Sequence, residues 1–361
     1  MGEVDLSVEV AGFRFENPLV LSEGPLSGDA RLIRRAAEHR VGAICTKSIR
    51  MQPALSANPY MIRTCHGKGL INADWTSIGF DAWMKELDQV KIRQPLMVNI
   101  GTNDTPPQQA GDLADTLHAH GADFVTFSDY EPENLVEAVA QARKHTDVPI
   151  MVKLPPFKKN IGDLCRRLEE AGVTMIAAMD AVGPAMDIDI ETGRPILGND
   201  GAYGYLSAEP IFPLTLAYIS EIVANVTVPV LGVGGVTSAE DAIKLIMAGA
   251  TFVGLVGAPI LKGLSVFDTI EADMRRWMEE HGIRSLNEIR GIAQPYIHPA
   301  EDTSLRAKVD RELCIGCGLC EKSCYQGAIS IEEKKAVVDG RYCSGCGVCQ
   351  TTCPKRAIRV C

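Results

Sequence analysis

Short, continuous apolar runs recur along the first 260 residues, and most of them are followed by a segment with helical periodicity. The predicted strands are 19–22, 43–47, 96–100, 124–127, 150–154, 175–179, 230–232 and 252–256. The predicted helices are 29–38, 80–91, 108–120, 133–144, 161–171, 211–224, 238–247 and 266–280. Strands that are apolar throughout and alternate with helices favour a parallel sheet with both faces covered.

Eight strand–helix units favour a closed TIM (β/α)8 barrel, an α/β fold of about 250 residues. The alternative is a doubly wound open sheet, which would place a glycine-rich fingerprint after the first strand. Gly24-Pro25 does not supply that fingerprint. Residues 4–15 alternate polar and apolar positions around Ala11-Gly12, so they predict a short hairpin in front of the barrel.

Two further segments divide the chain. Residues 180–209 form a long connection rich in Gly, Pro and Asp after the sixth strand, and loops of that length are usually functional. In a barrel this connection lies at the catalytic face. Residues 291–305 contain prolines and short polar side chains and are interpreted as a linker. We expect a barrel domain over residues 1–298 and a small second domain over 299–361.

Eight of the twelve cysteines form two runs with the spacing C-x2-C-x2-C-x3-C. Such runs hold [4Fe–4S] clusters in bacterial two-cluster ferredoxins, in which the fourth cysteine of each run ligates the other cluster. The expected ligands are Cys314, Cys317, Cys320 and Cys353 for one cluster, and Cys343, Cys346, Cys349 and Cys324 for the second. Zinc knuckles are the alternative, but two complete runs favour iron–sulfur. Tyr325 stands where the first run usually has proline.

The formal net charge of −10 argues against nucleic acid or an anionic membrane as a partner. The start lacks the features of a signal peptide and no apolar run is long enough to span a membrane, so a cytoplasmic protein is expected. The cysteines outside the two runs have no paired spacing. Among them, Cys45 and Cys165 lie in apolar segments and are expected to be buried and inert.

Glycine clusters follow the two last predicted strands, at 232–236 and 254–258. Barrels often bind phosphate with the loops after strands seven and eight, because small residues leave backbone N–H groups accessible. Tight turns are the alternative for either cluster taken alone. A cofactor that joins one-electron clusters to two-electron substrate chemistry is a flavin, so FMN is the best candidate.

Several short motifs carry a family resemblance. They are Gly24-Pro25, Thr46-Lys47-Ser48, Ile71-Asn72, Gly79-Phe80, Val152-Lys153-Leu154-Pro155-Pro156 and Gly232-Val233-Gly234-Gly235. In this order they resemble the dihydroorotate dehydrogenases and the FMN barrel of dihydropyrimidine dehydrogenase, over most of residues 1–290. A barrel of this kind followed by a two-cluster ferredoxin tail is most similar to the pyrimidine-reducing subunits of bacterial dihydropyrimidine dehydrogenases.

The resemblance implies roles for several residues. Lys47 and Lys153 would contact the flavin, where a cation stabilises the anionic reduced form. The other residues implied at the cofactor are Gly24, Thr46, Ser48, Asn99, Gly234, Gly235, Gly257 and Ala258. Asn72 is the substrate-binding asparagine that the chain keeps. Trp75 lies either over the substrate or in the core.

The chain also departs from the family. An Asn-x-Ser-Cys-Pro segment is expected after the fourth strand, but the sequence there is Ser128-Asp129-Tyr130-Glu131-Pro132. Asp180-Ala181 replaces an Asn-Ser/Thr pair after the sixth strand. We expect Ser128 and Asp180 to contact substrate in an acidic pocket. Its acids would be Glu131, Asp129 and Asp180, with Glu23 a weaker member. Glu131, Tyr130 or Asp180 would supply the proton. Alternatively, Glu131 is only the first-turn acid of the following helix.

These features indicate an FMN- and iron–sulfur-dependent oxidoreductase that reduces, or in reverse forms, an activated C=C bond in a small molecule other than orotate. The alternatives are a dihydropyrimidine dehydrogenase subunit acting on uracil or thymine, and an electron-relay subunit without its own substrate. No dinucleotide fingerprint is present, so a partner flavoprotein subunit or a ferredoxin is expected to exchange electrons with the chain. The resemblance implies a homodimer or a larger complex.

Overall fold

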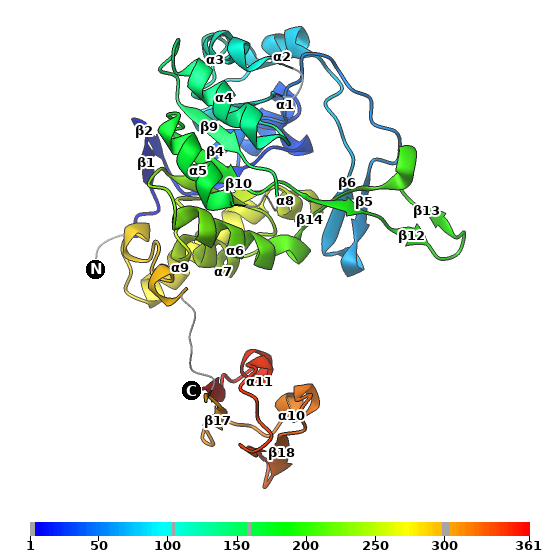
Figure 1. Ribbon diagram of the computed structural model, residues 1–361, viewed down its shortest axis with the longest axis vertical. Coiled ribbons are helices and arrows are strands. Elements are labelled where there is room, and N and C mark those ends of the chain that lie inside the picture. Colours follow the sequence, from blue (N-terminus) through cyan, green and yellow to red (C-terminus); the bar gives the residue numbers. More distant parts are fainter. Residues whose placement is uncertain (1–3, 103–104, 157–159, 298–303) are drawn as a thin grey trace. The chain divides into compact units, whose positions relative to one another are not determined.

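The computed structural model describes residues 4–102, 105–156, 160–297 and 304–361. The chain divides into two compact units, Met1–Tyr296 and Ile297–Cys361 (Figure 1). The domain boundary expected between residues 298 and 299 lies outside the described residues. Residues 291–296, predicted as linker, belong to the larger unit, because Gly291 and Ala293 donate backbone hydrogen bonds to the carbonyls of Ile246 and Met247.

In the described part of the larger unit, eight parallel strands close a barrel in the order β10-β15-β16-β3-β4-β7-β8-β9. The strands are β3 (Leu19–Leu21), β4 (Ala43–Cys45), β7 (Leu96–Gly101), β8 (Phe124–Ser128), β9 (Ile150–Lys153), β10 (Met175–Ala178), β15 (Val230–Val233) and β16 (Phe252–Leu255). The predicted TIM barrel is therefore confirmed. Nearly all strand residues are buried, because side chains fill the barrel interior and helices cover the outside.

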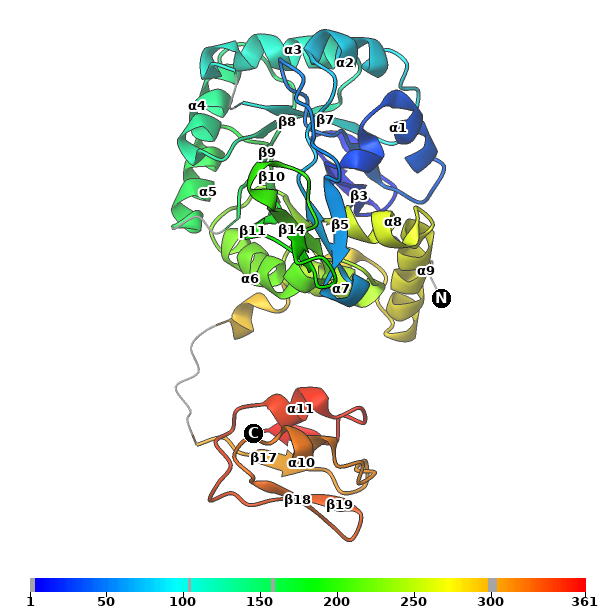
Figure 2. The ribbon, with the colours of Figure 1, turned by 90° about the vertical axis from the view of Figure 1, so that its right-hand side faces the viewer.

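A ring of helices surrounds the strands (Figure 2). The helices are α1 (Ala30–Ala36), α2 (Phe80–Leu87), α3 (Ala110–Ala119), α4 (Pro132–Ala142), α5 (Ile161–Glu170), α6 (Phe212–Val223), α7 (Ala239–Met247), α8 (Gly257–Lys262) and α9 (Val266–Glu280). In α4 the buried residues Leu135, Ala138, Val139 and Ala142 have the three- and four-residue spacing of one helical face. Of these described helices around the barrel, only the short α8 was not predicted from the sequence.

The predicted hairpin is present as β1 (Val8–Val10) and β2 (Phe13–Phe15), which pair antiparallel across a turn with positive φ at Ala11 and Gly12. Phe15 packs on Phe124 and Phe252, the first residues of β8 and β16. The hairpin therefore closes the amino-terminal end of the barrel and leaves the carboxyl end for the site.

A second sheet, which we call the roof sheet, lies at the carboxyl end, because its segments follow β4 and β10. It contains β5 (Met61–Thr64), β6 (Gly69–Asn72), β11 (Val182–Ala185) and β14 (Gly204–Ala208) in the order β11-β14-β6-β5. The expectation that residues 180–209 form a loop is wrong. They contain two roof strands and the hairpin of β12 (Ile188–Asp189) and β13 (Arg194–Pro195), which projects in Figure 1.

The smaller unit is built from two similar halves. Strands β17 (Ala307–Val309) and β20 (Ile358–Val360) pair, as do β18 (Ile329–Glu332) and β19 (Lys335–Val338). Helices α10 (Leu319–Ser323) and α11 (Val348–Thr352) each follow the first two cysteines of a run and contain the third. In neither unit do the described residues include a helix long and apolar enough to cross a membrane.

Candidate active site

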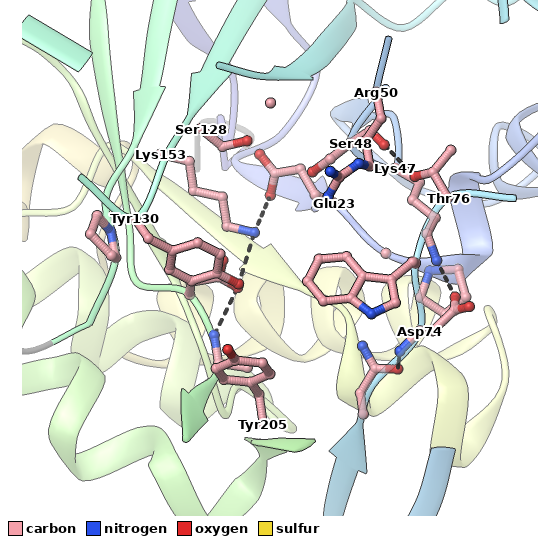
Figure 3. A pocket seen from close by; sticks show the side chains of 18 of the residues that line it. Glu23, Lys47, Ser48, Arg50, Asp74, Thr76, Ser128, Tyr130, Lys153 and Tyr205 are labelled. Carbon is pink, nitrogen blue, oxygen red and sulfur yellow. Dashed lines mark hydrogen bonds and ion pairs between the residues drawn. The ribbon is translucent and has the colours of Figure 1, made fainter. Parts of the chain in front are cut away.

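Two adjoining hollows lie at the carboxyl end of the barrel, bordered by the roof sheet. The first, here the acidic hollow, is lined by the ends of several barrel strands and by residues 72–76 (Figure 3). The second, the glycine hollow, is lined by the segments after β15 and β16. Both hollows share Glu23, Gly24, Pro25, Asn72, Lys153, Asp180 and Ala181. One ligand can therefore extend from one hollow into the other.

Lys153, the last residue of β9, lies at this junction and is nearly buried. Its Nζ is 3.4 Å from Glu23 Oε2 and 3.3 Å from Asp180 Oδ1. Burial by itself lowers the pKa of Lys153, but the carboxylates of Asp180 and Glu23 outweigh that effect. The net pKa therefore lies above the ordinary value for lysine, and Lys153 is a cation at neutral pH.

Glu23 follows β3, and its side chain is 2% exposed. Cys45, fully buried at the end of β4, donates its thiol hydrogen to Glu23 Oε1 at 3.1 Å. Burial, and then the charge of Glu23, raise the pKa of Cys45 well above that of an ordinary thiol. Cys45 is therefore a neutral hydrogen-bond donor, as its apolar setting predicted. Glu23 has a more central position than the sequence indicated.

A chain of polar contacts continues along the neighbouring strands. Ser128 donates to Asn99 Oδ1 at 2.9 Å, and the Asn99 N–H donates to Thr46 Oγ1 at 3.0 Å. Two buried polar atoms in this region, Ser22 Oγ and Asn99 Nδ2, have no hydrogen-bond partner among the described residues, and Glu23 Oε2 has the ion pair with Lys153 but no hydrogen bond. Buried polar atoms are normally satisfied. Their lack of partners here fits a polar ligand in the barrel mouth.

The glycine hollow fits a phosphate group. Gly234 and Gly235 have φ values of +130° and +80°, which side chains rarely adopt. A Cβ on Gly235 would lie 2.5 Å from the backbone N of Phe212, and one on Gly257 would lie 2.5 Å from Ala208 Cβ. The backbone is therefore exposed to the hollow only because these residues are glycines. Ala258 is buried in α8 and does not line the hollow itself.

Residues 72–76 pass beside the acidic hollow. Asp74 forms an ion pair with Lys47 and accepts a hydrogen bond from Ser56, and Thr76 donates to the Ser48 carbonyl. These contacts hold Lys47 and Ser48 in the lining of the acidic hollow.

Trp75 also lines the acidic hollow and is 41% exposed, so it is not a core residue. The Arg50 guanidinium lies 5.5 Å from the Trp75 ring centroid. Arg50, Asp74 and Tyr205 were not predicted, because no motif marks them.

Tyr130 and Tyr205 lie next to each other in the lining of the acidic hollow. Their rings are stacked, with centroids 6.2 Å apart, and Tyr130 comes from the segment after β8 while Tyr205 comes from β14. Burial, and then the charge of Asp180, raise the pKa of Tyr130 above its ordinary value, although Lys153 opposes the rise. Tyr130 therefore keeps its proton at neutral pH.

Glu131 does not lie in the acidic pocket where it was expected. Its side chain is exposed, it lines neither hollow, and it occupies the N-cap position of α4. Its neighbour Asp129 is buried instead and accepts hydrogen bonds from Thr102 Oγ1 and the Glu131 N–H. Glu131 therefore stands just before the first turn of α4, in which Glu133 is the acidic residue, and lies outside both hollows.

The eight cysteines of the two runs line two small cavities in the smaller unit. Cys314, Cys317, Cys320 and Cys353 line one, and Cys324, Cys343, Cys346 and Cys349 line the other. Each cavity thus combines three cysteines of one run with the last cysteine of the other run. Backbone N–H groups donate to the sulfurs of Cys314, Cys324, Cys343 and Cys353 at 3.3–3.5 Å. Such hydrogen bonds stabilise the thiolates that bind a cluster.

Comparison with known proteins agrees with this geometry. A family model described as Dihydroorotate dehydrogenase matches residues 5–278, and one described as 4Fe-4S dicluster domain matches residues 313–357. The chain is similar to Dihydroorotate dehydrogenase B (NAD(+)), catalytic subunit, of Pyrococcus abyssi, with 33% identity over 301 residues, 80% of this chain and 99% of the relative. The protein of the same name from Pyrococcus furiosus is 33% identical over 309 residues, 81% of this chain and 99% of the relative.

Proposed function

The chain belongs to the dihydroorotate dehydrogenase family, and from this premise we propose that its two [4Fe–4S] clusters exchange electrons with FMN, which reduces, or in reverse forms, an activated C=C bond in a small molecule. As a family member it is an FMN-dependent oxidoreductase acting on a CH–CH bond. When bound, FMN supplies hydride chemistry and accepts single electrons, which joins the clusters to the substrate.

The observation that carries the proposal is the junction of the two hollows at Lys153. The glycine hollow suits the FMN phosphate, and the acidic hollow on the other side of Lys153 has the polar lining of a substrate site. Two separate hollows would instead favour a relay that holds FMN and has no substrate of its own.

For the proton we propose Tyr130, which replaces Glu131 in this role. Tyr130 lines the acidic hollow and Glu131 does not. A tyrosine whose pKa is raised holds its proton, so it can donate to a substrate carbon but is rarely available as a base at neutral pH. The resting site therefore holds the proton that reduction of a double bond consumes.

The side chains that line the acidic hollow also indicate which class of substrate can bind. Glu23, Asp74 and Asp180 are carboxylates, and both lysines of the acidic hollow, Lys47 and Lys153, are paired with them. A substrate carboxylate would have to compete for these cations and would be repelled by the acids. We propose a neutral substrate that donates hydrogen bonds to Asp180, of which uracil and thymine are examples.

The second candidate substrate is the dihydroorotate/orotate pair. The relatives are named for it, so the comparisons give no support to the expected exclusion of orotate. Those names also describe the relatives as catalytic subunits. A partner that exchanges electrons with the clusters, either a flavoprotein subunit or a ferredoxin, fits this description, as does a homodimer or a larger complex.

An anaerobic reoxidation experiment tests the proposal. The flavin of the purified protein is bleached with dithionite, uracil, thymine or orotate is added, and the absorbance of oxidised FMN is followed. A faster return with uracil or thymine than with orotate supports a neutral substrate. A faster return with orotate would reject it in favour of dihydroorotate chemistry, and Asp180→Asn should then have little effect on orotate. No return with any neutral or acidic acceptor would favour the relay.

A further inference from the structure

Lys153 is held from two sides by carboxylates that follow different barrel strands. Glu23 follows β3 and Asp180 follows β10, so the ammonium group of β9 lies between them. We call Glu23 and Asp180 the carboxylate clamp. Figure 3 shows the contact between Lys153 and Glu23 at the centre of the pocket.

The clamp gives this cluster an excess of negative charge. It contains two carboxylates and one ammonium group, while the neighbouring Cys45 thiol and Tyr130 phenol are neutral because burial and the acids raise their pKa values. The side chains of Glu23 and Lys153 are only 2% and 10% exposed. Solvent therefore screens the charges of these two groups weakly.

Reduction of a flavin adds negative charge to it, so charges nearby change its reduction potential. A lone lysine would stabilise the reduced form and raise the potential, whereas a lysine with two carboxylates favours the oxidised form. Glu23, Lys153 and Asp180 line both hollows and so lie where FMN would bind.

We propose that Glu23 and Asp180 are positioning residues that fix Lys153 and lower the reduction potential of bound FMN. The reduced flavin is then a stronger electron donor to an acceptor double bond. The inference goes beyond the proposed function, because it concerns the flavin and holds for any substrate.

The test is the midpoint potential of FMN, measured without substrate in the complete chain by anaerobic spectroelectrochemical titration. Glu23→Gln keeps the shape and can still accept the Cys45 hydrogen bond, but it removes one charge. Its reduced FMN should bind about tenfold more tightly relative to oxidised FMN, which raises the potential by about 30 mV for a two-electron couple. Fluorescence measurements of both FMN dissociation constants should give the same ratio.

Glu271→Gln is the matched control. Glu271 is a buried carboxylate of α9 whose side chain is 4% exposed and which pairs with Arg275, outside both hollows. Its variant should leave the potential unchanged. Glu23→Asp restores the charge and should return the potential towards that of the native protein.

Two outcomes overturn the proposal. One is an unchanged potential in Glu23→Gln. The other is an equal rise in Glu23→Gln and Glu23→Asp, which would assign the effect to packing. If Glu23→Gln does not fold, Asp180→Asn removes the other charge from a side chain that is 36% exposed, and the potential must rise there as well. Because no substrate is present, the result is independent of the reoxidation experiment.

Discussion

Substitution of Gly235 by alanine tests whether the glycine hollow depends on a close approach between backbones. Gly235 has φ +80°, and a Cβ there would lie 2.5 Å from the backbone N of Phe212, the first residue of α6. The neighbour is main chain at the start of a helix, so it cannot turn aside as a flexible side chain would. Either α6 or the segment after β15 must move.

Two costs add at this position. A left-handed conformation costs a residue with a Cβ about 1–2 kcal/mol, and overpacking costs about 1–3 kcal/mol. Gly282 isolates the first cost, because it has φ +69° and no heavy atom of the described chain lies within 4 Å of its ideal Cβ. Gly235→Ala should therefore lose about 1–3 kcal/mol more than Gly282→Ala. Each Gly→Ala substitution lowers the conformational entropy of the unfolded chain by about the same amount, so this contribution cancels when the two variants are compared.

The assay is thermal unfolding of the FMN-free proteins, followed by circular dichroism. A domain of this size loses about 2–4 °C in Tm for each kcal/mol, so Gly235→Ala should unfold about 2–12 °C below Gly282→Ala. If one phosphate contact is lost as well, FMN affinity should fall about ten- to a hundredfold in Gly235→Ala alone. Equal Tm values and equal FMN affinities in the two variants would refute the reasoning.

Three further predictions follow from the site. Tyr130→Phe should slow reoxidation of the reduced flavin by substrate about 10²–10⁴-fold, while Glu131→Gln should stay within about twofold; stopped-flow absorbance measures both, and the reverse pattern would restore Glu131 as the acid. Because the pKa of Lys153 is raised in the folded chain, its ion pairs stabilise the fold fully below the unfolded-state pKa of about 10.4. That stabilisation is lost only as the pH rises through the higher pKa of the folded state. The FMN dissociation constant should therefore show no step from Lys153 between pH 6 and 10, and a step near 8 would contradict the clamp. Cys353→Ser should lose the cluster held with Cys314, and iron analysis should fall from about eight to about four atoms per chain; loss of all iron or of none would contradict the grouping of the cavities.

The barrel could be predicted because its strands are apolar throughout and each is followed by a helix, a pattern that depends on local sequence alone. The roof sheet could not. Its strands are short and partly exposed, β11 contains Pro184, and β6 pairs with a strand more than 130 residues away. Local periodicity carries no information on such pairing.

The site residues also include some that the sequence could predict and some that it could not. Lys153 and Asp180 lie where strand ends predicted them, because the carboxyl ends of parallel strands meet at one edge of the barrel. The prediction for Glu131 was wrong because the neighbouring Pro132 indicates where a helix begins but not the direction in which the Glu131 side chain points. The importance of Glu23 depends on its distances to Lys153 and Cys45, which only the folded chain provides.

The roof sheet also constrains how the specificity of this barrel can change during evolution. Four residue pairs join β6 to β14, and one of them sets Asn72 directly opposite Tyr205, so two of the residues that line the acidic hollow share a single register. An insertion of one residue in either strand would turn its side chains to the opposite face. The two segments must therefore diverge together, as a coupled pair, while the barrel strands beneath them stay as they are. Chimeras that exchange residues 61–76 and 182–208 as one unit should fold more readily than chimeras that exchange either segment alone.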